Sequence, residues 1–296
     1  MRLILAIAGL LLWQGAGFAI SCAGGDTMQA LAERWGAEML PTKLSADGFE
    51  LFLQGKVECV TFVREPFATE LAAYKAKFGA VPLLVPVAGG SYATRSATHA
   101  IAIYVNQANP LTKMTMDELE GVFSGRVSRW PNGQPIHVYG MLRARGTGNP
   151  PGIVNFLQNR ILHGAAMRDD VREQIDQPGE TALDAIVHRV AEDPLGIGFS
   201  GFAYAAPGTK TLALAETAAG PYYRGSPEEV AARLYPLSRL IYLMVPPDPS
   251  AGQRDFLRHV LSDEGQAAIS GDPMGFLPLT AAEREAARAR FDRRKP

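Results

Sequence analysis

Short, continuous apolar runs alternate along the chain with stretches in which apolar residues recur every three to four positions. The continuous runs predict strands at residues 19–25, 57–63, 81–89, 98–106, 135–141, 195–205 and 238–245. The recurring pattern predicts helices at residues 26–39, 44–55, 115–125, 153–164, 182–193 and 251–270. Alternation of strands and helices over this length predicts an α/β fold with mainly parallel sheets.

Polar side chains mark the expected starts of the first two helices. Asp26 with Gln29 approximates a capping box, and Ser45 and Asp47 are N-cap candidates for the second helix. Glycine-rich junctions between a strand and a helix occur once in each half of the chain. Open α/β sheets bind ligands at the carboxyl ends of their strands, so these two junctions are where we expect a site.

The first residues have the pattern of an export signal. Arg2 precedes an apolar run too short to span a bilayer, and small residues follow at Gly17 and Ala19. We therefore expect residues 1–19 to be a signal peptide cleaved after Ala19, and the mature protein to be periplasmic or secreted. The alternative is a lipoprotein anchored through Cys22. Ala19 is a poor residue three positions before such a cysteine, which favours the form without a lipid.

The chain has two cysteines, Cys22 and Cys59. An exported protein can pair them. Both lie in apolar, strand-like runs, however, and buried free cysteines are common there. The pattern therefore favours two buried thiols over a disulfide.

Composition excludes some classes of function. The 296 residues are 47% hydrophobic and 20% charged, which is ordinary for a soluble globular protein of one large or two medium domains. A formal net charge of -1 gives no overall electrostatic attraction to nucleic acid. The five histidines are far apart and lack metal-ligand spacing, and no nucleophile-elbow motif occurs. We therefore predict no enzymatic activity, no metal and no cofactor.

The first candidate site is the run Gly24-Gly25-Asp26-Thr27. A helix N-terminus offers free N–H groups and a partial positive charge, which suits an anion. Glycine allows an anion to approach the backbone closely. The alternative is that Asp26 only caps its helix.

The second candidate is the loop "RARGTGNPPG" at residues 143–152. Arg143 and Arg145 can each hold an oxyanion through two hydrogen bonds. Inward-pointing N–H groups would come from Gly146, Thr147, Gly148 and Asn149. The alternative is a solvated basic turn.

Ser45 and Arg64 complete the candidate set. Ser45 lies at a helix start, and Arg64 directly follows an apolar strand. A charge is unexpected at that strand end unless it faces a cleft or a partner. An ion pair with Glu65 or Glu70 is the alternative.

Four phrases in order resemble the PstS-like family of periplasmic phosphate-binding proteins of ABC transporters. They are "GGDTMQALAERW", "NPLTKMTMDELEGVFSG" followed by Trp130, "YPLSRLIYLMV" and "MGFLPL". The similarity runs from about Ile20 to Leu279. The resemblance implies a type II-like binding-protein fold, in which two lobes joined by hinge strands close on an oxyanion without a covalent step. It implies lobe I at residues 20–103 and 236–296, and lobe II at residues 104–235.

The resemblance also implies roles for the candidate residues. The ligand-binding positions that match the family pattern are Gly25, Asp26, Thr27, Ser45, Arg64, Arg143 or Arg145, Gly146, Thr147 and Gly148. The implied ligand is inorganic phosphate or a similar oxyanion, the implied partner an ABC permease, and the expected state a monomer. Asp26 would accept a hydrogen bond from a protonated anion such as hydrogen phosphate and repel sulfate.

The chain departs from the family pattern at several of these positions. Gly25 replaces a serine, "RGTGNPP" is not Ser-Gly-Thr, and Phe62 and Val63 stand where the family often has polar residues. Hydroxyl donors are therefore lost. The alternative function is a PstS-like scaffold or sensor that has lost tight ligand binding and acts through protein contacts.

Overall fold

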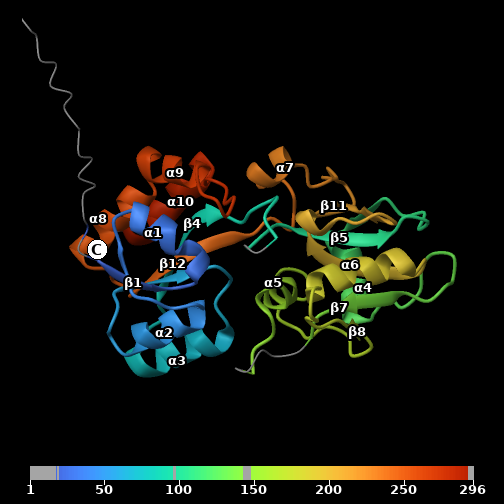
Figure 1. Ribbon diagram of the computed structural model, residues 1–296, viewed down its shortest axis with the longest axis horizontal. Coiled ribbons are helices and arrows are strands. Elements are labelled where there is room, and N and C mark those ends of the chain that lie inside the picture. Colours follow the sequence, from blue (N-terminus) through green and yellow to red (C-terminus); the bar gives the residue numbers. More distant parts are fainter. Residues whose placement is uncertain (1–17, 19, 96–97, 143–147, 293–296) are drawn as a thin grey trace, which may run out of the picture.

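The strands form two separate five-stranded sheets, one in each half of an elongated molecule (Figure 1). The computed structural model describes residues 18, 20–95, 98–142 and 148–292. The first sheet has the order β2-β1-β3-β12-β4, with β1 (Ser21–Gly24), β2 (Glu38–Met39), β3 (Cys59–Phe62), β4 (Leu83–Gly89) and β12 (Leu240–Val245). The second has the order β10-β5-β9-β7-β8, with β5 (Ile101–Asn106), β7 (His137–Gly140), β8 (Arg172–Glu173), β9 (Gly196–Gly201) and β10 (Thr209–Thr211). A two-stranded sheet pairs β6 (Lys113–Thr115) with β11 (Ala213–Ala215).

Both large sheets are mixed rather than mainly parallel, which corrects that part of the prediction. In the first sheet β1 is parallel to β2 and β3, whereas β12 is antiparallel to β3 and β4. In the second, β7 is parallel to β8 and β9, whereas β5 is antiparallel to β9 and β10. Parallel neighbours need a crossover connection. β5 and β12 instead enter their sheets directly from the other half of the chain, so their direction follows from that crossing.

Helices pack on both faces of each large sheet. The first half contains η1 (Asp26–Met28), α1 (Gln29–Arg34), α2 (Ser45–Leu53), α3 (Ala68–Phe78), α8 (Ala251–Val260), α9 (Asp263–Ser270) and α10 (Ala281–Asp292). The second half contains α4 (Met116–Ser124), α5 (Gly152–Arg160), α6 (Ala182–Glu192), η2 (Phe202–Tyr204) and α7 (Pro227–Ala231). The α/β class predicted from the sequence is therefore confirmed.

The predicted helix at residues 251–270 is two helices in the structure. α8 ends at Val260, and Ser262 begins α9 by accepting a hydrogen bond from the Gly265 N–H at 3.1 Å. A serine in this position competes with the helical backbone and favours a new cap over a continuous helix. The apolar spacing continues across the break because both helices pack on the same core.

Each half has its own hydrophobic interior. In the second half, β5, β7 and β9 pack with α4, α5 and α6 around one core. In the first half, one face of the sheet packs with α1, α8, α9 and α10, and the other face with α2 and α3. Trp35 is almost fully buried after α1, and its Nε1 donates to the carbonyl of Gly265 at 2.8 Å. This bond ties the N-terminal helix to the C-terminal ones.

A disulfide joins Cys22 to Cys59, so the expectation of two free thiols is wrong. Cys22 of β1 and Cys59 of β3 are register partners in adjacent parallel strands, with Cα atoms 4.6 Å apart. This distance lies within the range that a disulfide spans. The pairing was not evident in the sequence because it depends on the register of two strands that are separated by η1, α1, β2 and α2.

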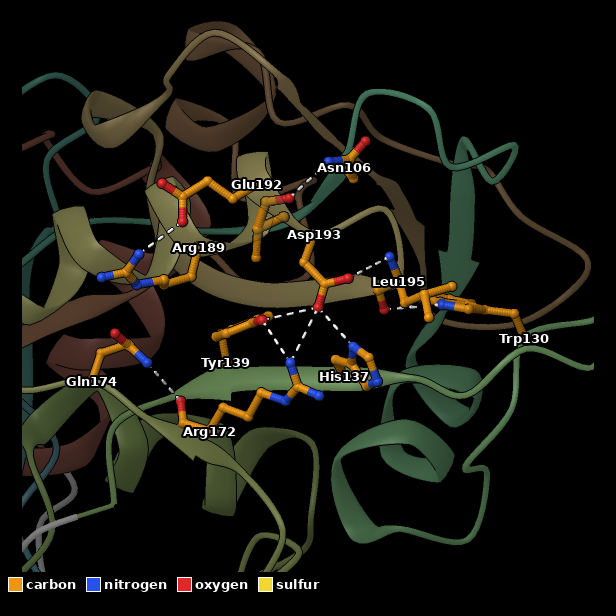
Figure 2. A network of polar contacts seen from close by, with 11 residues as sticks. Asn106, Trp130, His137, Tyr139, Arg172, Gln174, Arg189, Glu192, Asp193 and Leu195 are labelled. Carbon is orange, nitrogen blue, oxygen red and sulfur yellow. Dashed lines mark hydrogen bonds and ion pairs between the residues drawn. The ribbon is translucent and has the colours of Figure 1, made fainter.

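A polar network joins β7, β8 and the residue after α6 at one end of the second sheet (Figure 2). Asp193, which follows α6, accepts hydrogen bonds from Tyr139 Oη at 2.9 Å and from the Leu195 N–H at 2.9 Å. His137 Nδ1 lies 2.7 Å from the same carboxylate, and Arg172 contacts Tyr139 Oη at 2.9 Å. Burial would raise the pKa of Asp193, but the hydrogen bonds from Leu195, His137 and Tyr139 outweigh it and lower the pKa. His137 is the first residue of β7, so this network lies at the opposite end of the strand from the carboxyl end.

Candidate functional site

A cavity of about 540 Å³ lies between the two halves, at the carboxyl ends of their strands. Asp26 and Thr27 follow β1, and Val63 and Arg64 follow β3. From the second half, Met141 follows β7 and Tyr204 follows β9. Further lining residues are Lys43, Leu44, Ser45, Ala46, Phe67, Arg95, Thr98, His99, Asn149, Pro150, Pro151, Gly152, Ile153, Asp176, Thr181, Leu183 and Arg239. The strand ends of both halves therefore meet at one site, as expected for an open α/β sheet.

The two glycines between β1 and η1 are required by close packing against neighbouring residues. Gly24 has φ +150°, and a Cβ there would lie 2.3 Å from the carbonyl oxygen of Thr61. A Cβ on Gly25 would lie 2.9 Å from Val63 Cγ1, and the Gly25 N–H donates to the Thr61 carbonyl at 3.2 Å. Gly25 is not among the described residues that line the cavity. Gly24 is therefore required by the close approach of the β3 backbone, and Gly25 by the close approach of the Val63 side chain.

Asp26 and Thr27 line the cavity, and the side-chain oxygens of both have no hydrogen-bond partner among the described residues. Gly25 is the N-cap of η1, Met28 is the N-cap of α1, and neither helix has a side-chain cap. The predicted capping box of Asp26 with Gln29 is therefore wrong. Asp26 is exposed, and its carboxylate has no hydrogen-bond partner in the described part of the chain. Thr27 Oγ1 is buried and likewise has no partner there.

Ser45 fastens the start of α2 to the end of β3. Its hydroxyl donates to the Thr61 carbonyl at 3.0 Å and accepts from the Val63 N–H at 3.2 Å. The N-cap of α2 is Leu44, whose N–H donates to Asp47 Oδ2 at 3.0 Å, so neither Ser45 nor Asp47 is the N-cap. The Asp47 N–H donates to the Leu44 carbonyl at 3.0 Å, whereas no hydrogen bond among the described residues uses the N–H groups of Ser45 and Ala46, which both line the cavity.

Arg64 lines the cavity but is paired with Glu70. Its Nη1 donates to Glu70 Oε2 at 2.8 Å and its Nη2 to Glu70 Oε1 at 2.5 Å. The side chains of Arg64 and Glu70 are 13% and 9% exposed, and the guanidinium stacks 3.8 Å from the ring centroid of Phe67. The ion pair that the sequence left open as an alternative is thus present, and it is largely buried.

The second half presents the start of α5 to the cavity. Pro151 is the N-cap, and Pro150, Gly152 and Ile153 also line the cavity. A Cβ on Gly152 would lie 3.2 Å from Arg64 Cβ, so this helix start packs directly on the first half. Arg143, Arg145, Gly146 and Thr147 lie outside the described residues. Gly148 is described, with φ +76°, but is not among the cavity-lining residues.

Hydrogen bonds between described residues join the first half to the second half, and to the crossing between β4 and β5, beside the cavity. Thr98 Oγ1 donates to the Val63 carbonyl, and Thr69 Oγ1 donates to Asn149 Oδ1 at 3.0 Å. Asn155 Nδ2 of α5 donates to the Glu65 carbonyl at 3.2 Å. The cavity walls are therefore held together by direct hydrogen bonds.

Sequence reasoning missed several charged residues of the cavity. Lys43, Arg95, Asp176 and Arg239 all line it. Arg95 pairs with Asp184 at 2.8 Å, and Arg239 pairs with Glu65 at 2.7 Å. Arg239 shared a signal with Arg64, because each is a charge directly beside an apolar strand, Arg64 after β3 and Arg239 before β12. Lys43 and Arg95 carried no comparable signal.

The arrangement suits non-covalent binding of a small anion. The starts of η1, α2 and α5 converge on one cavity, and the N-terminus of a helix attracts negative charge. Among the described residues no group of three or more His, Cys, Asp and Glu side chains is placed to hold a metal ion.

Two α/β halves with an anion-suited cavity between their strand ends define a two-lobe solute-binding protein. Residues 40–264 match the family described as the PBP superfamily domain. The chain belongs to this family.

Comparison with known proteins agrees with the resemblance to the PstS-like family and confirms it. The chain is 28% identical to the phosphate-binding protein PstS of Pseudomonas aeruginosa, over 90% of this chain and 85% of that protein. It is 26% identical to the protein SphX of Synechococcus elongatus, over 82% of this chain and 69% of that protein. Among solved structures, an ABC-type phosphate transport receptor from Vibrio cholerae is similar with a TM-score of 0.57 and 18% identity, over 88% of this chain and 100% of that chain. PstS from Borrelia burgdorferi is similar with a TM-score of 0.56 and 13% identity, over 89% and 99% of the two chains. These structures confirm the two-lobe fold.

Proposed function

We propose that this protein binds inorganic phosphate, or a closely related oxyanion, in the cavity between its lobes and delivers it to an ABC permease. The observation that supports this most directly is the convergence of three helix starts from both halves on one cavity. Phosphate binding by PstS of Pseudomonas aeruginosa and the transport role named for the Vibrio cholerae receptor support the same function. The protein acts by binding alone and catalyses no reaction.

The proposed ligand contacts come first from the first half. Thr27 Oγ1 donates to the anion, the first-turn N–H groups of α2 donate beside it, and Asp26 accepts from a protonated anion. Ser45 positions these groups, and Arg64 contributes positive potential that Glu70 partly offsets. From the second half, Arg143, Arg145, Gly146 and Thr147 remain predicted contacts.

The proposed lobes follow the two hydrophobic interiors. The chain leaves the core of the first half after Ala88 and enters the core of the second half at Ala100. It returns to the core of the first half between Leu237 and Ile241. We place the hinge in these two segments, close to the bounds of 20–103 and 236–296 for lobe I and 104–235 for lobe II.

The proposed location is the periplasm, after removal of a signal peptide, with the mature protein a monomer. Cys22 is fully buried and bonded to Cys59, which opposes its use as a lipid-bearing N-terminus. No helix in the described part of the chain has the length and apolar character needed to cross a bilayer.

Replacing Thr27 with valine tests the proposed function. The hydroxyl has no partner among the described residues, so its loss leaves the folded state without a broken hydrogen bond. A hydrogen bond to a charged ligand contributes about 1.5–3 kcal/mol, so phosphate affinity falls roughly 10- to 100-fold. Titration calorimetry gives the affinity, and thermal unfolding without ligand is the control for stability. Undetectable phosphate binding by the wild type would instead support the scaffold or sensor that has lost its ligand.

Replacing Asp26 with asparagine tests the proposed acceptor role. A carboxylate only accepts hydrogen bonds, whereas an amide also donates, so the substitution removes repulsion toward anions that carry no proton. We expect sulfate affinity to rise relative to phosphate affinity at fixed pH and ionic strength. Asp248→Asn, an exposed aspartate outside the cavity, is the matched control. An unchanged sulfate-to-phosphate ratio, with both anions bound, would contradict this role.

A further inference from the structure

Arg239 lies where the chain crosses from the second half into the first sheet. Leu237 belongs to the core of the second half, and β12 begins in the first sheet at Leu240. The other crossing passes beside it, because the Gly90 N–H donates to the Arg239 carbonyl at 2.9 Å. Arg239 is therefore a hinge residue, and it also lines the cavity.

The Arg239 guanidinium is buried but incompletely paired. Its side chain is 4% exposed, and its Nη2 donates to Glu65 Oε2 at 2.7 Å. Arg239 Nε and Glu65 Oε1 are both buried without a hydrogen-bond partner among the described residues. Buried polar groups in native proteins are almost always hydrogen-bonded, so unused donors beside a cavity point to a group that occupies the cavity.

The other cavity arginines have fewer donors to offer. Both terminal nitrogens of Arg64 are held by Glu70. The Arg95 side chain is 57% exposed, pairs with Asp184 and donates its Nε to the Ala203 carbonyl. A guanidinium carries five N–H groups. In Arg239 one terminal nitrogen bonds Glu65, and no hydrogen bond in the described part of the chain uses Nε or Nη1.

We propose that Arg239 binds the anion from the hinge, an inference that rests on the proposed function. Glu65 is the positioning residue that fixes the guanidinium from the first half, and Phe156 of α5 supports its face from the second half at 5.0 Å. The Glu65 carbonyl in turn accepts a hydrogen bond from Asn155 of α5. Arg239 is thus held by groups from both lobes, so its contact with the anion depends on the relative position of the lobes.

The test is titration of the mature, full-length protein with inorganic phosphate. Arg239→Gln removes the cation, and loss of a buried, hydrogen-bonded charge contact weakens affinity by roughly 30-fold or more. Arg239→Lys keeps the charge but loses the planar fork, and we expect a loss of roughly 3- to 10-fold. Glu65→Gln keeps Arg239 and weakens its anchoring, with an expected loss in the same range.

Arg233→Gln is the matched control. Arg233 is also a largely buried arginine near the crossing, with a side chain 13% exposed and an ion pair to Glu283 at 3.2 Å, but it does not line the cavity. It shares the structural cost of losing a buried ion pair without the proposed ligand contact. We expect its phosphate affinity to stay within about threefold of the wild type, since no ligand hydrogen bond is lost.

Each outcome decides the inference. Titrations are run at a temperature at which circular dichroism shows every variant folded, and Arg239→Lys serves if Arg239→Gln does not fold. Equal phosphate affinity of the Arg239 variants and the wild type would overturn the inference and leave the proposed function standing. An equal loss in Arg233→Gln would also overturn it, because the effect would then be structural. Absence of phosphate, sulfate and molybdate binding by the wild type would overturn both proposals.

Discussion

Replacing Arg64 with alanine is expected to lower the free energy of unfolding by about 3–5 kcal/mol, the usual result of removing one partner from a buried ion pair. Glu70, 9% exposed, would keep its charge without the two guanidinium hydrogen bonds. The stacking of Arg64 on Phe67 would be lost as well. Chemical denaturation monitored by circular dichroism measures the change.

Two further variants test whether the loss of stability comes from the unpaired charge of Glu70. Arg64→Ala combined with Glu70→Ala removes the stranded charge and should recover part of the stability. Arg126→Ala breaks an exposed pair, with an arginine side chain 53% exposed, and should cost under about 1 kcal/mol. If Arg64→Ala left the unfolding free energy unchanged and abolished phosphate binding, Arg64 would be a ligand cation and its pair with Glu70 incidental.

Removal of the disulfide by Cys22→Ala with Cys59→Ala is expected to lower the free energy of unfolding by about 3–4 kcal/mol. The bond closes a loop of sequence separation 37, and a cross-link of this length mainly restricts the unfolded chain. The strands β1 and β3 that it joins carry Asp26, Thr27 and Arg64 just beyond their ends. Phosphate affinity of the folded double variant tests whether the bond also orders these residues.

Reduction during unfolding is the control for the disulfide. Wild-type protein unfolded with dithiothreitol present should reach the denaturation midpoint of the double variant, because the bond is reduced once the chain opens. In the native state both cysteines are fully buried, so the reductant alone should not change the folded protein. A midpoint that neither the reductant nor the double variant changes would show that the cross-link contributes little to stability.

Strands and helices could be predicted from the sequence wherever their pattern lies within a few neighbouring residues. The largely apolar run at residues 57–63 predicts a buried strand, and β3 within it, Cys59–Phe62, is buried at all four positions. The helix at 115–125 was equally predictable, since Thr115 accepts from the Glu118 N–H and Gly125 ends the helix at positive φ. The break at Ser262 was missed because the apolar spacing continues through it.

The direction of strands and the partners of charged residues depended on contacts between distant segments. β12 is antiparallel to β3 because it enters from the other half of the chain, which no local pattern records. The disulfide depended on register, because the side chains of Cys22 and Cys59 can meet only when β1 and β3 align at these positions.

What the sequence by itself determined about this protein is the main buried strands, six helical regions and the α/β class. It also determined the strand ends at which Asp26, Thr27 and Arg64 lie and the helix start at which Ser45 lies. Only the tertiary structure decided how each of these residues is used. Ser45 bonds the backbone of β3, Arg64 pairs with Glu70, and Thr27 is left with an unused hydroxyl. Arg239, which is remote from these residues in the sequence, lines the same cavity. Hydrogen bonds and ion pairs depend on distances of a few ångströms, and such distances between remote residues exist only after the two halves have packed together.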